Sequence, residues 1–405
     1  MRNSSHYILG LALGLVTITP VLGIGGFRLG YGLILVIALW RLVVIRVNVP
    51  RSAQLFLLWL IPLSYALLID SYRIGEDGFS LFARGALALL GGFMLITDGQ
   101  EPGALKRVLL GAAPIVAANA IVAIMQYFGS VDAVLLGMSV SGDEGMEAMR
   151  EELDVGGLRA SGLQGASHVF AYTMGVWAFL YSWIAVRTRI SSVTDNIIWL
   201  VAMVVVAGVI LSAQRSVVWL ILPALFMLLF LRYRGISRML VAGAAITFFI
   251  IIVGSAELLS DAGILRRLAN LSGSTSGDIE RQRTWYLAWL VIAEDPFLGS
   301  AFASYNFHRG IHNGFLNGWA RYGVVWLLLV LIGLGTYLYA ILAGRRHLLD
   351  QFAGCVLLAL VLANAMFHTS GPAIGDMIVF VAFPFGLIYA GGSVPWSRDV
   401  NVQDK

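Results

Sequence analysis

Long apolar stretches alternate with short polar ones along almost the whole chain. Crossing the hydrocarbon core of a bilayer takes about 20 residues of α-helix, and twelve stretches approach that length: 7–25, 27–46, 53–70, 80–97, 108–129, 167–186, 196–212, 216–232, 238–254, 320–343, 351–368 and 374–391. A helix is predicted for each, because a helix satisfies its own backbone groups in lipid and the alternating pattern of barrel strands is absent. The pattern therefore predicts an all-α, polytopic membrane protein with about twelve transmembrane helices in a single transmembrane domain over residues 1–405.

Two parts of this pattern have a second interpretation. The stretch 7–25 follows Arg2 and has the outline of a signal peptide, but another apolar stretch begins almost at once and no convincing cleavage site separates them, so it is interpreted as a span. The stretches on either side of the turn from Ser212 to Ser216 are predicted to be two spans, although one long re-entrant segment would produce a similar pattern.

The composition agrees with a surface that faces membrane lipid. Hydrophobic residues make up 59% of the chain and charged residues 12%, whereas a soluble domain has roughly 25% charged residues. The formal net charge of +4 does not indicate a nucleic-acid partner, because basic residues lie in short clusters between apolar stretches, such as Arg41, Arg46 and Arg51. Cys355 is the only cysteine in the sequence, which excludes an internal disulfide, and its apolar neighbours predict a buried, inert thiol.

Basic residues also predict the orientation of the chain. With the N-terminus in the cytoplasm, fifteen of the 27 Lys and Arg residues lie on the cytoplasmic side, and eight of the other twelve lie in two long outer loops or directly beside them. Basic residues of short loops collect on the cytoplasmic side of membrane proteins, whereas long loops follow this rule weakly. Both termini are therefore predicted to be cytoplasmic.

Two outer segments are longer than a connection between spans requires. The first, residues 130–166, is acidic and contains Glu152 and Asp154, which either bind a metal or form a solvated surface; the solvated surface is the preferred interpretation. The second, residues 255–319, lies between the ninth and tenth predicted spans and is the longest polar segment. The polar chemistry of the protein is expected in this second loop.

The long loop contains a predicted helix. Asp278 is a suitable N-cap, and the helix is expected to end at Asp295, where a proline follows. Trp285 lies one turn after Arg281, so both belong to one stripe of the helix, and Arg283 also lies near its start. Arginines oppose the helix dipole at this end unless an anion binds there. The two arginines are therefore either a phosphate-binding pair or a solvated or interfacial pair.

Other candidates for chemistry lie at the outer boundary of the spans. Arg215 lies in a short outer turn and either extends to the membrane interface or binds an anion. His312 and Asn313 come immediately before the tenth span, where a histidine would serve either as a base for a hydroxyl group or as a structural hydrogen-bonding residue. His308 and His312 have the spacing of two metal ligands on a helix, but no further ligands lie close in sequence, so no metal is expected.

The ordered set of motifs in this region resembles bacterial O-antigen ligases and the related O-antigen polymerases. The matching pieces lie between residues 150 and 325 and are, in chain order, Arg159–Gly165, Ser212–Arg215, Glu280–Trp285, Asp295–Gly299, His312–Leu316 and Tyr322-Gly323. There are two departures from the family pattern. The family often has Gly-x-Gly after the proline, whereas here Gly299 is followed by Ser300 and Ala301, and after Gly165 it often has Pro-Asn, whereas this chain has Ser167 and His168. The predicted number of spans and the large loop between the ninth and tenth also resemble the ligases.

The resemblance implies a metal-independent glycosyltransferase, without a cofactor, at the periplasmic face of the bacterial inner membrane. It implies a donor glycan carried on undecaprenyl diphosphate, and an acceptor that is lipid A-core, in lipopolysaccharide biosynthesis, or a growing glycan. By position, Arg281 and Arg215 match family arginines thought to hold the diphosphate, and His312 matches the histidine thought to activate the acceptor hydroxyl. Four further residues are candidate substrate contacts, the first of which matches another family arginine: Arg159, Arg283, Asn313 and Trp285.

Two alternatives to a ligase are kept. A polymerase that joins repeat units on the same lipid carrier would use the same motifs. A transporter, such as a flippase for that lipid, would place ionisable residues near the middle of the bilayer. The polar residues deep in the predicted spans are mostly neutral, for example Asn119, Gln126 and Asn364, which favours an enzyme over a transporter.

Overall fold

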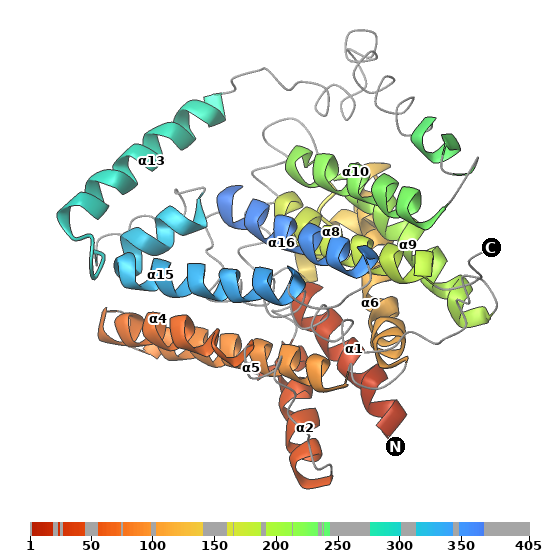
Figure 1. Ribbon diagram of the computed structural model, residues 1–405, viewed down its shortest axis with the longest axis horizontal. Helices are drawn as coiled ribbons and strands as arrows, with labels where there is room; N and C mark the ends of the chain where they lie inside the picture. Colours follow the sequence, from red (N-terminus) through yellow and green to blue (C-terminus); the bar gives the residue numbers. More distant parts are fainter. Residues whose placement is uncertain are drawn as a thin grey trace.

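The structure is a computed structural model, and the residues that it describes are 2–18, 23–24, 27–44, 56–73, 76–98, 103–140, 160–164, 166–187, 192–212, 214–233, 237, 239–243, 276–300, 313–342 and 348–367. Its main helices (Figure 1) are α1 (Arg2–Ile18), α2 (Leu29–Val44), α4 (Leu60–Arg73), α5 (Glu76–Asp98), α6 (Ala104–Tyr127), α8 (Ser167–Arg187), α9 (Val193–Leu211), α10 (Arg215–Arg232), α13 (Ser276–Glu294), α15 (Gly314–Leu342) and α16 (Leu348–Phe367). Two strands of two residues each, β1 (Gly23–Ile24) and β2 (Phe27–Arg28), form an antiparallel pair in the connection between α1 and α2.

The predicted helical membrane protein is confirmed in its general form. Among the described residues, six helices are long and apolar enough to cross a membrane: α6, α8, α9, α10, α15 and α16. Shorter apolar helices coincide with four more of the predicted stretches. Most of the stretch 238–254 and all of 374–391 lie outside the described residues. The count of twelve spans therefore stays a prediction.

Many polar contacts between the described segments lie near one of two ends of the bundle. One group joins Arg107 with His6, Arg41 with Ser5, Lys106 with Asp195, Arg187 with Asp350, and Arg232 with the backbone of Val186. The other joins Gln164 with Thr17, Gln126 with Gly162, Tyr172 with Ser216 and Ala363, and Arg73 with Arg321. We call the end of the bundle where the second group lies the motif end. It comprises the C-terminal ends of α1, α4, α6 and α16, the N-terminal ends of α8 and α10, and the N-terminal part of α15. The first group lies at the opposite end.

The assignment of polar contacts to the two ends of the bundle distinguishes the two interpretations of the Ser212–Ser216 turn. The start of α9 lies at the opposite end, where Asp195 forms an ion pair with Lys106 at 2.6 Å. The start of α10 lies at the motif end, where the Ser216 and Tyr172 hydroxyls are 2.7 Å apart. Helices α9 and α10 therefore run in opposite directions as two separate helices, as predicted, and do not form one re-entrant segment.

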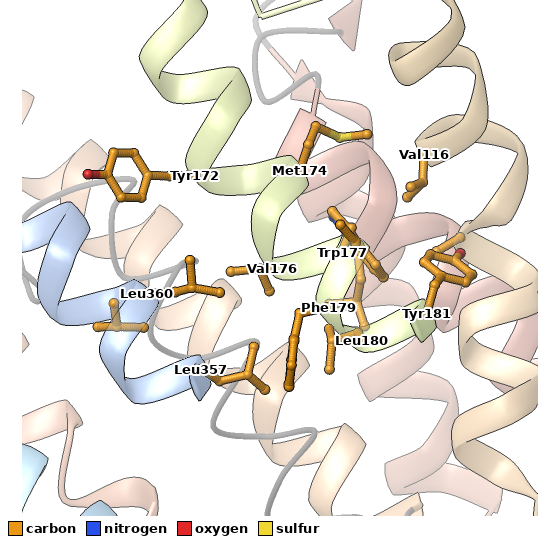
Figure 2. Packing of buried hydrophobic residues seen from close by; sticks show 14 of the residues in the cluster. Val116, Tyr172, Met174, Val176, Trp177, Phe179, Leu180, Tyr181, Leu357 and Leu360 are labelled. Atoms are coloured by element: carbon orange, nitrogen blue, oxygen red, sulfur yellow. The ribbon is translucent and has the colours of Figure 1, made fainter. Parts of the chain in front are cut away.

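Helix α8 lies at the centre of the bundle. In the apolar stretch of α8 that is long enough to cross a membrane, 89% of the residues are buried, a larger share than in any other of the six long apolar helices. Figure 2 shows its side chains, among them Trp177 and Phe179, between Val116 of α6 on one side and Leu357 and Leu360 of α16 on the other. A helix that is apolar on every face is typical of such a central position.

Close approach of α1 and α6 depends on glycine. A side chain at Gly10 would overlap the backbone oxygen of Val108, and one at Gly111 would overlap the backbone of Tyr7. Small residues let membrane helices pack this closely, because lipid supplies no hydrophobic force between them. The prediction for Cys355 was wrong: this residue is exposed on α16, because it lies on the side of the helix that no other described helix covers.

Candidate functional site

Helix α15 has a sharp kink at Gly323, where φ is 81° and ψ is 177°. In a regular helix the N–H of Val324 would donate to the carbonyl oxygen of Ala320. Here the N–H of Val324 donates instead to the oxygen of Pro296, at 2.8 Å, and the oxygen of Ala320 accepts from the N–H of Ser300, also at 2.8 Å. The turn 296–300 therefore satisfies both backbone groups that the kink separates. We call this arrangement the turn–kink contact.

The turn–kink contact joins two of the motif pieces from the sequence. Asp295 shapes the turn, because its side chain accepts from the N–H of Leu298 and its backbone oxygen from the N–H of Gly299. Gly299 has a φ of 71°, in the left-handed region. The motif Asp295–Gly299 and the pair Tyr322-Gly323, more than 20 residues apart, are thus two halves of one structural feature.

Two residues of α4 hold the turn–kink contact from the side. Both carboxylate oxygens of Asp70 are used: Oδ1 accepts from Nε and Nη2 of Arg321, at 3.3 and 3.1 Å, and Oδ2 accepts from the hydroxyl of Tyr322, at 2.9 Å. The guanidinium of Arg73 donates to three backbone oxygens, those of Arg321 (2.5 Å), Gly299 (2.6 Å) and Leu298 (3.2 Å). Arg73 therefore contacts both the turn and the segment before the kink.

Helix α13 packs against the first part of α15 in the same direction (Figure 1). The rings of Trp289 and Trp319 meet edge to face with centroids 5.4 Å apart, and the indole N–H of Trp319 donates to the oxygen of Pro296 at 3.1 Å. A small apolar cluster extends this contact and comprises Ala288, Val291, Ile292 and Ala320, with Trp285, Leu316 and Trp319 packed against it. Because contacts advance along both segments together, the start of α13 lies at the same end of the pair as the start of α15.

The predicted helix of the long loop is present, with a different start. It begins at Ser276, so Asp278 lies in its first turn and is not its N-cap, and it ends at Glu294, close to the expected position. The predicted stripe has a packing function at Trp285, which packs against the apolar cluster. Arg283 is exposed. Arg281 lies in the first half of the helix, but its side chain lies outside the described part.

Asn313 caps the first part of α15. Its side-chain oxygen accepts from the N–H groups of Phe315 and Leu316, both at 3.1 Å, and its backbone oxygen accepts from that of Asn317. This is the ordinary geometry of an asparagine N-cap, so Asn313 has a structural function, and the predicted substrate contact stays a prediction. His312, the neighbouring residue, lies outside the described residues.

Arg215 is the first residue of α10 and is half-buried. No acidic residue lies in the first turn of this helix, and Gln214 before it forms no side-chain cap. The next residue, Ser216, is tied to Tyr172 of α8, whose hydroxyl also donates to the oxygen of Ala363 in α16 at 3.4 Å. Helix α16 runs antiparallel to α15, because Tyr337 donates to the oxygen of Gly354 near its start. Arg215 therefore lies at the motif end, as the start of α15 does.

The segment that follows Arg159 is buried at the motif end. Gln126 of α6 accepts from the N–H groups of Ser161 and Gly162, at 3.0 and 2.8 Å, and donates to the oxygen of Gly162 at 2.9 Å. Asn119, two turns earlier on the same face of α6, accepts from the N–H of Leu163 at 2.7 Å. These two amides replace the hydrogen bonds that a helix would supply. Arg159 itself lies outside the described residues.

Residues 160–164 are also tied to α1 and α8. The side chain of Gln164 donates to the oxygen of Thr17 and to the hydroxyl of Thr173, at 3.0 and 3.1 Å. The predicted neutral polar residues of the spans thus have a common function in this structure: Asn119 and Gln126 hold non-helical backbone inside the bundle.

Among the described residues, no group of three or more His, Cys, Asp or Glu side chains has the arrangement of a metal site. Sequence reasoning did not select Asp70, Arg73 or Arg321. A charge at the end of an apolar stretch is costly in lipid and marks a paired or functional position, and Asp70 has this pattern. Its partner was not apparent, because Arg321 lies 251 residues away in sequence.

No protein-family model matches this sequence, and no curated protein matches it.

Proposed function

We propose that this protein is a membrane glycosyltransferase similar to O-antigen ligases, which transfers a glycan from undecaprenyl diphosphate to a hydroxyl group of an acceptor. The proposed acceptor is lipid A-core, and the proposed location is the periplasmic face of the bacterial inner membrane, with about twelve spans and both termini in the cytoplasm. The turn–kink contact is the observation that supports this proposal most directly. Two motif pieces that resemble the ligases pack against each other, and the same contact holds α13 beside the segment that follows His312.

The residue types fit the chemistry of such a donor. A glycosyl diphosphate has a good leaving group, so the bond between the anomeric carbon and the phosphate oxygen breaks without a general acid. Negative charge then develops on the departing undecaprenyl diphosphate, and the proposed function of Arg281 and Arg215 is to stabilise it. The acceptor oxygen forms the new bond to the anomeric carbon, and His312 is proposed to take its proton.

The grouping of these positions supports one shared site. Arg215 begins α10 at the motif end, and Asn313, next to His312, begins α15 at the same end. Arg281 belongs to the first half of α13, which runs parallel to the first part of α15. Residues 160–164, which follow Arg159, are held at the same end by Gln126.

A reconstituted reaction tests the proposal. Purified protein in lipid nanodiscs is mixed with a glycan on undecaprenyl diphosphate and with lipid A-core, and products are separated by mass. The proposal expects glycosylated lipid A-core from the wild type and none from His312→Ala, although the variant inserts and accumulates normally. Normal transfer by His312→Ala would remove this residue from the mechanism.

The same preparation separates the alternatives. Longer glycans on undecaprenyl diphosphate, formed without lipid A-core, would identify a polymerase. Movement of the lipid-linked glycan across liposomes, without any new glycosidic bond, would identify a transporter. In a deletion strain, a ligase predicts loss of the surface glycan ladder while polymer accumulates on the lipid carrier.

A further inference from the structure

We infer that Asp70 and Arg73 of α4 are positioning residues of the proposed transfer reaction, which hold the turn 295–300 and the segment 313–322 in place and thereby orient the acceptor base. The inference rests on the proposed function. Neither side chain belongs to a motif piece that resembles the ligases, and both act through other residues.

Asp70 binds two consecutive residues directly before the kink. Its side chain is 5% exposed and that of Arg321 is 11% exposed, so the pair is shielded from solvent. One carboxylate oxygen takes two donors from Arg321, and the other takes the hydroxyl of the buried Tyr322. The guanidinium of Arg321 also lies over the Tyr322 ring, 5.2 Å from its centroid. Rotation or sliding of the segment 313–322 would break all of these contacts together.

Arg73 fixes the turn to the same segment. Its Nη1 donates to the oxygen of Arg321, two residues before the kink, and its Nη2 donates to the oxygens of Leu298 and Gly299. A planar guanidinium spans acceptors on two different chain segments, whereas a lysine ammonium presents its donors from a single nitrogen. Arg73→Lys therefore keeps the charge and loses the bridge between turn and segment.

The position of this pair favours an effect on the reaction as well as on folding. The segment that it holds begins at Asn313, immediately after the proposed base, and packs against α13, which contains Arg281. A displacement of about 1 Å in a catalytic group costs on the order of 100-fold in rate.

The chain also contains a matched ion pair for comparison with that of Asp70 and Arg321. Arg187 and Asp350 form an ion pair between α8 and α16 at the opposite end, with side chains 11% and 8% exposed.

The experiment measures kcat, the KM for each substrate and the thermal midpoint in nanodiscs for four variants. Asp70→Asn and Arg73→Lys are expected to reduce kcat by about 10- to 100-fold and to leave the KM for the lipid-linked donor within about twofold. Tyr322→Phe removes one hydroxyl and keeps the packing. Its kcat is expected to lie between that of the wild type and those of Asp70→Asn and Arg73→Lys. Asp350→Asn is the control: its midpoint falls, and the kcat of the folded protein is unchanged.

A double variant tests the route of the effect. If Asp70 acts through Arg321, then Asp70→Asn combined with Arg321→Gln loses no more kcat than the worse single variant, because the two changes remove the same contact. Independent losses that multiply would contradict that route.

The outcomes separate the inference from the function on which it rests. Full kcat in Asp70→Asn and Arg73→Lys, with lowered midpoints like that of Asp350→Asn, would overturn the inference and leave the transferase intact. An equal fall of kcat in Asp350→Asn would show a general loss of structure and would also overturn it. A wild type that forms no glycosidic bond with any donor and acceptor would remove the proposed function, and the inference with it.

Discussion

Gly299 lies directly against Gly323. A Cβ atom on Gly299 would lie 2.7 Å from the backbone nitrogen of Gly323, and one on Gly323 would overlap the backbone of Phe297. Both residues have positive φ angles, 71° and 81°, which residues with a side chain rarely adopt. The two glycines thus allow two backbones to approach closely enough for the turn–kink contact, and neither position has room for a side chain.

Gly299→Ala and Gly323→Ala are therefore expected to destabilise the protein. A left-handed backbone costs about 1–2 kcal/mol for a residue with a Cβ. Gly323, with a ψ of 177°, has a conformation that is essentially restricted to glycine and costs other residues about 1–3 kcal/mol. The overlap with fixed backbone adds to these costs. We expect a lower thermal midpoint in detergent and loss of most transfer activity. Gly335→Ala in the same helix is the control, since a Cβ there meets nothing within 4 Å. A neutral result at both Gly299 and Gly323 would show that the turn–kink contact does not constrain the fold.

The amide of Gln126 gives a second prediction. Gln126→Leu has a similar volume but leaves the N–H groups of Ser161 and Gly162 without their acceptor inside the bundle. Each unsatisfied buried group costs about 1–3 kcal/mol, so we expect a loss of about 3 kcal/mol in the free energy of unfolding, read as a lower midpoint. Met125→Leu, at an exposed neighbour on α6, should be close to neutral. Equal midpoints for the two variants would contradict the assigned function of Gln126.

Much of the helical framework could be predicted from the sequence, because the length and polarity of a span are local properties. Helix α8 coincides with the stretch 167–186 to within a residue at its end. Helix starts in polar segments were harder, and α13 begins two residues before the predicted cap, Asp278, since several small polar residues there are suitable starts.

The partners of these helices could not be predicted, because contacts between residues far apart in sequence leave no local pattern. In the sequence, Asp70 is a charge at the end of an apolar stretch, and only the fold shows that Arg321 is its partner. Asn313 adjoins His312 and was predicted as a substrate contact; its capping function became apparent only in the fold, and the substrate contact stays a prediction. The kink at Gly323 was equally hidden, since its backbone groups bond to a turn more than 20 residues earlier.

The start of α9 gives a third prediction, at the end away from the proposed site. Ser192 and Asp195 form a capping box, and Asp195 also forms an ion pair with Lys106. Ser192→Ala is expected to cost about 1 kcal/mol, the usual value for a lost cap. Asp195→Ala should cost more, since it also leaves Lys106 unpaired. Both should lower the thermal midpoint and leave the transfer rate of the folded protein unchanged, and a reduced rate in either would show that the opposite end is coupled to the site.

The two arginines near the start of α13 give the prediction that most directly tests the proposed donor site. Residues two apart on a helix face different directions. Arg281 comes four residues before Trp285, whose ring packs against the apolar cluster, whereas Arg283 is exposed. Arg281→Ala is expected to reduce transfer by about 100-fold or more, as the loss of a group that stabilises developing charge does. Arg281→Lys keeps the charge but loses the fork that binds two phosphate oxygens, so it should recover only part of the rate.

Arg283→Ala is the matched control, with an expected change in rate within about threefold, because an exposed cation interacts weakly through water. Rates measured at saturating donor, together with the KM for the donor, distinguish these cases. An equal loss in the two alanine variants would mean that the diphosphate is held by the exposed side of the helix, and the assignment of Arg281 would then be wrong.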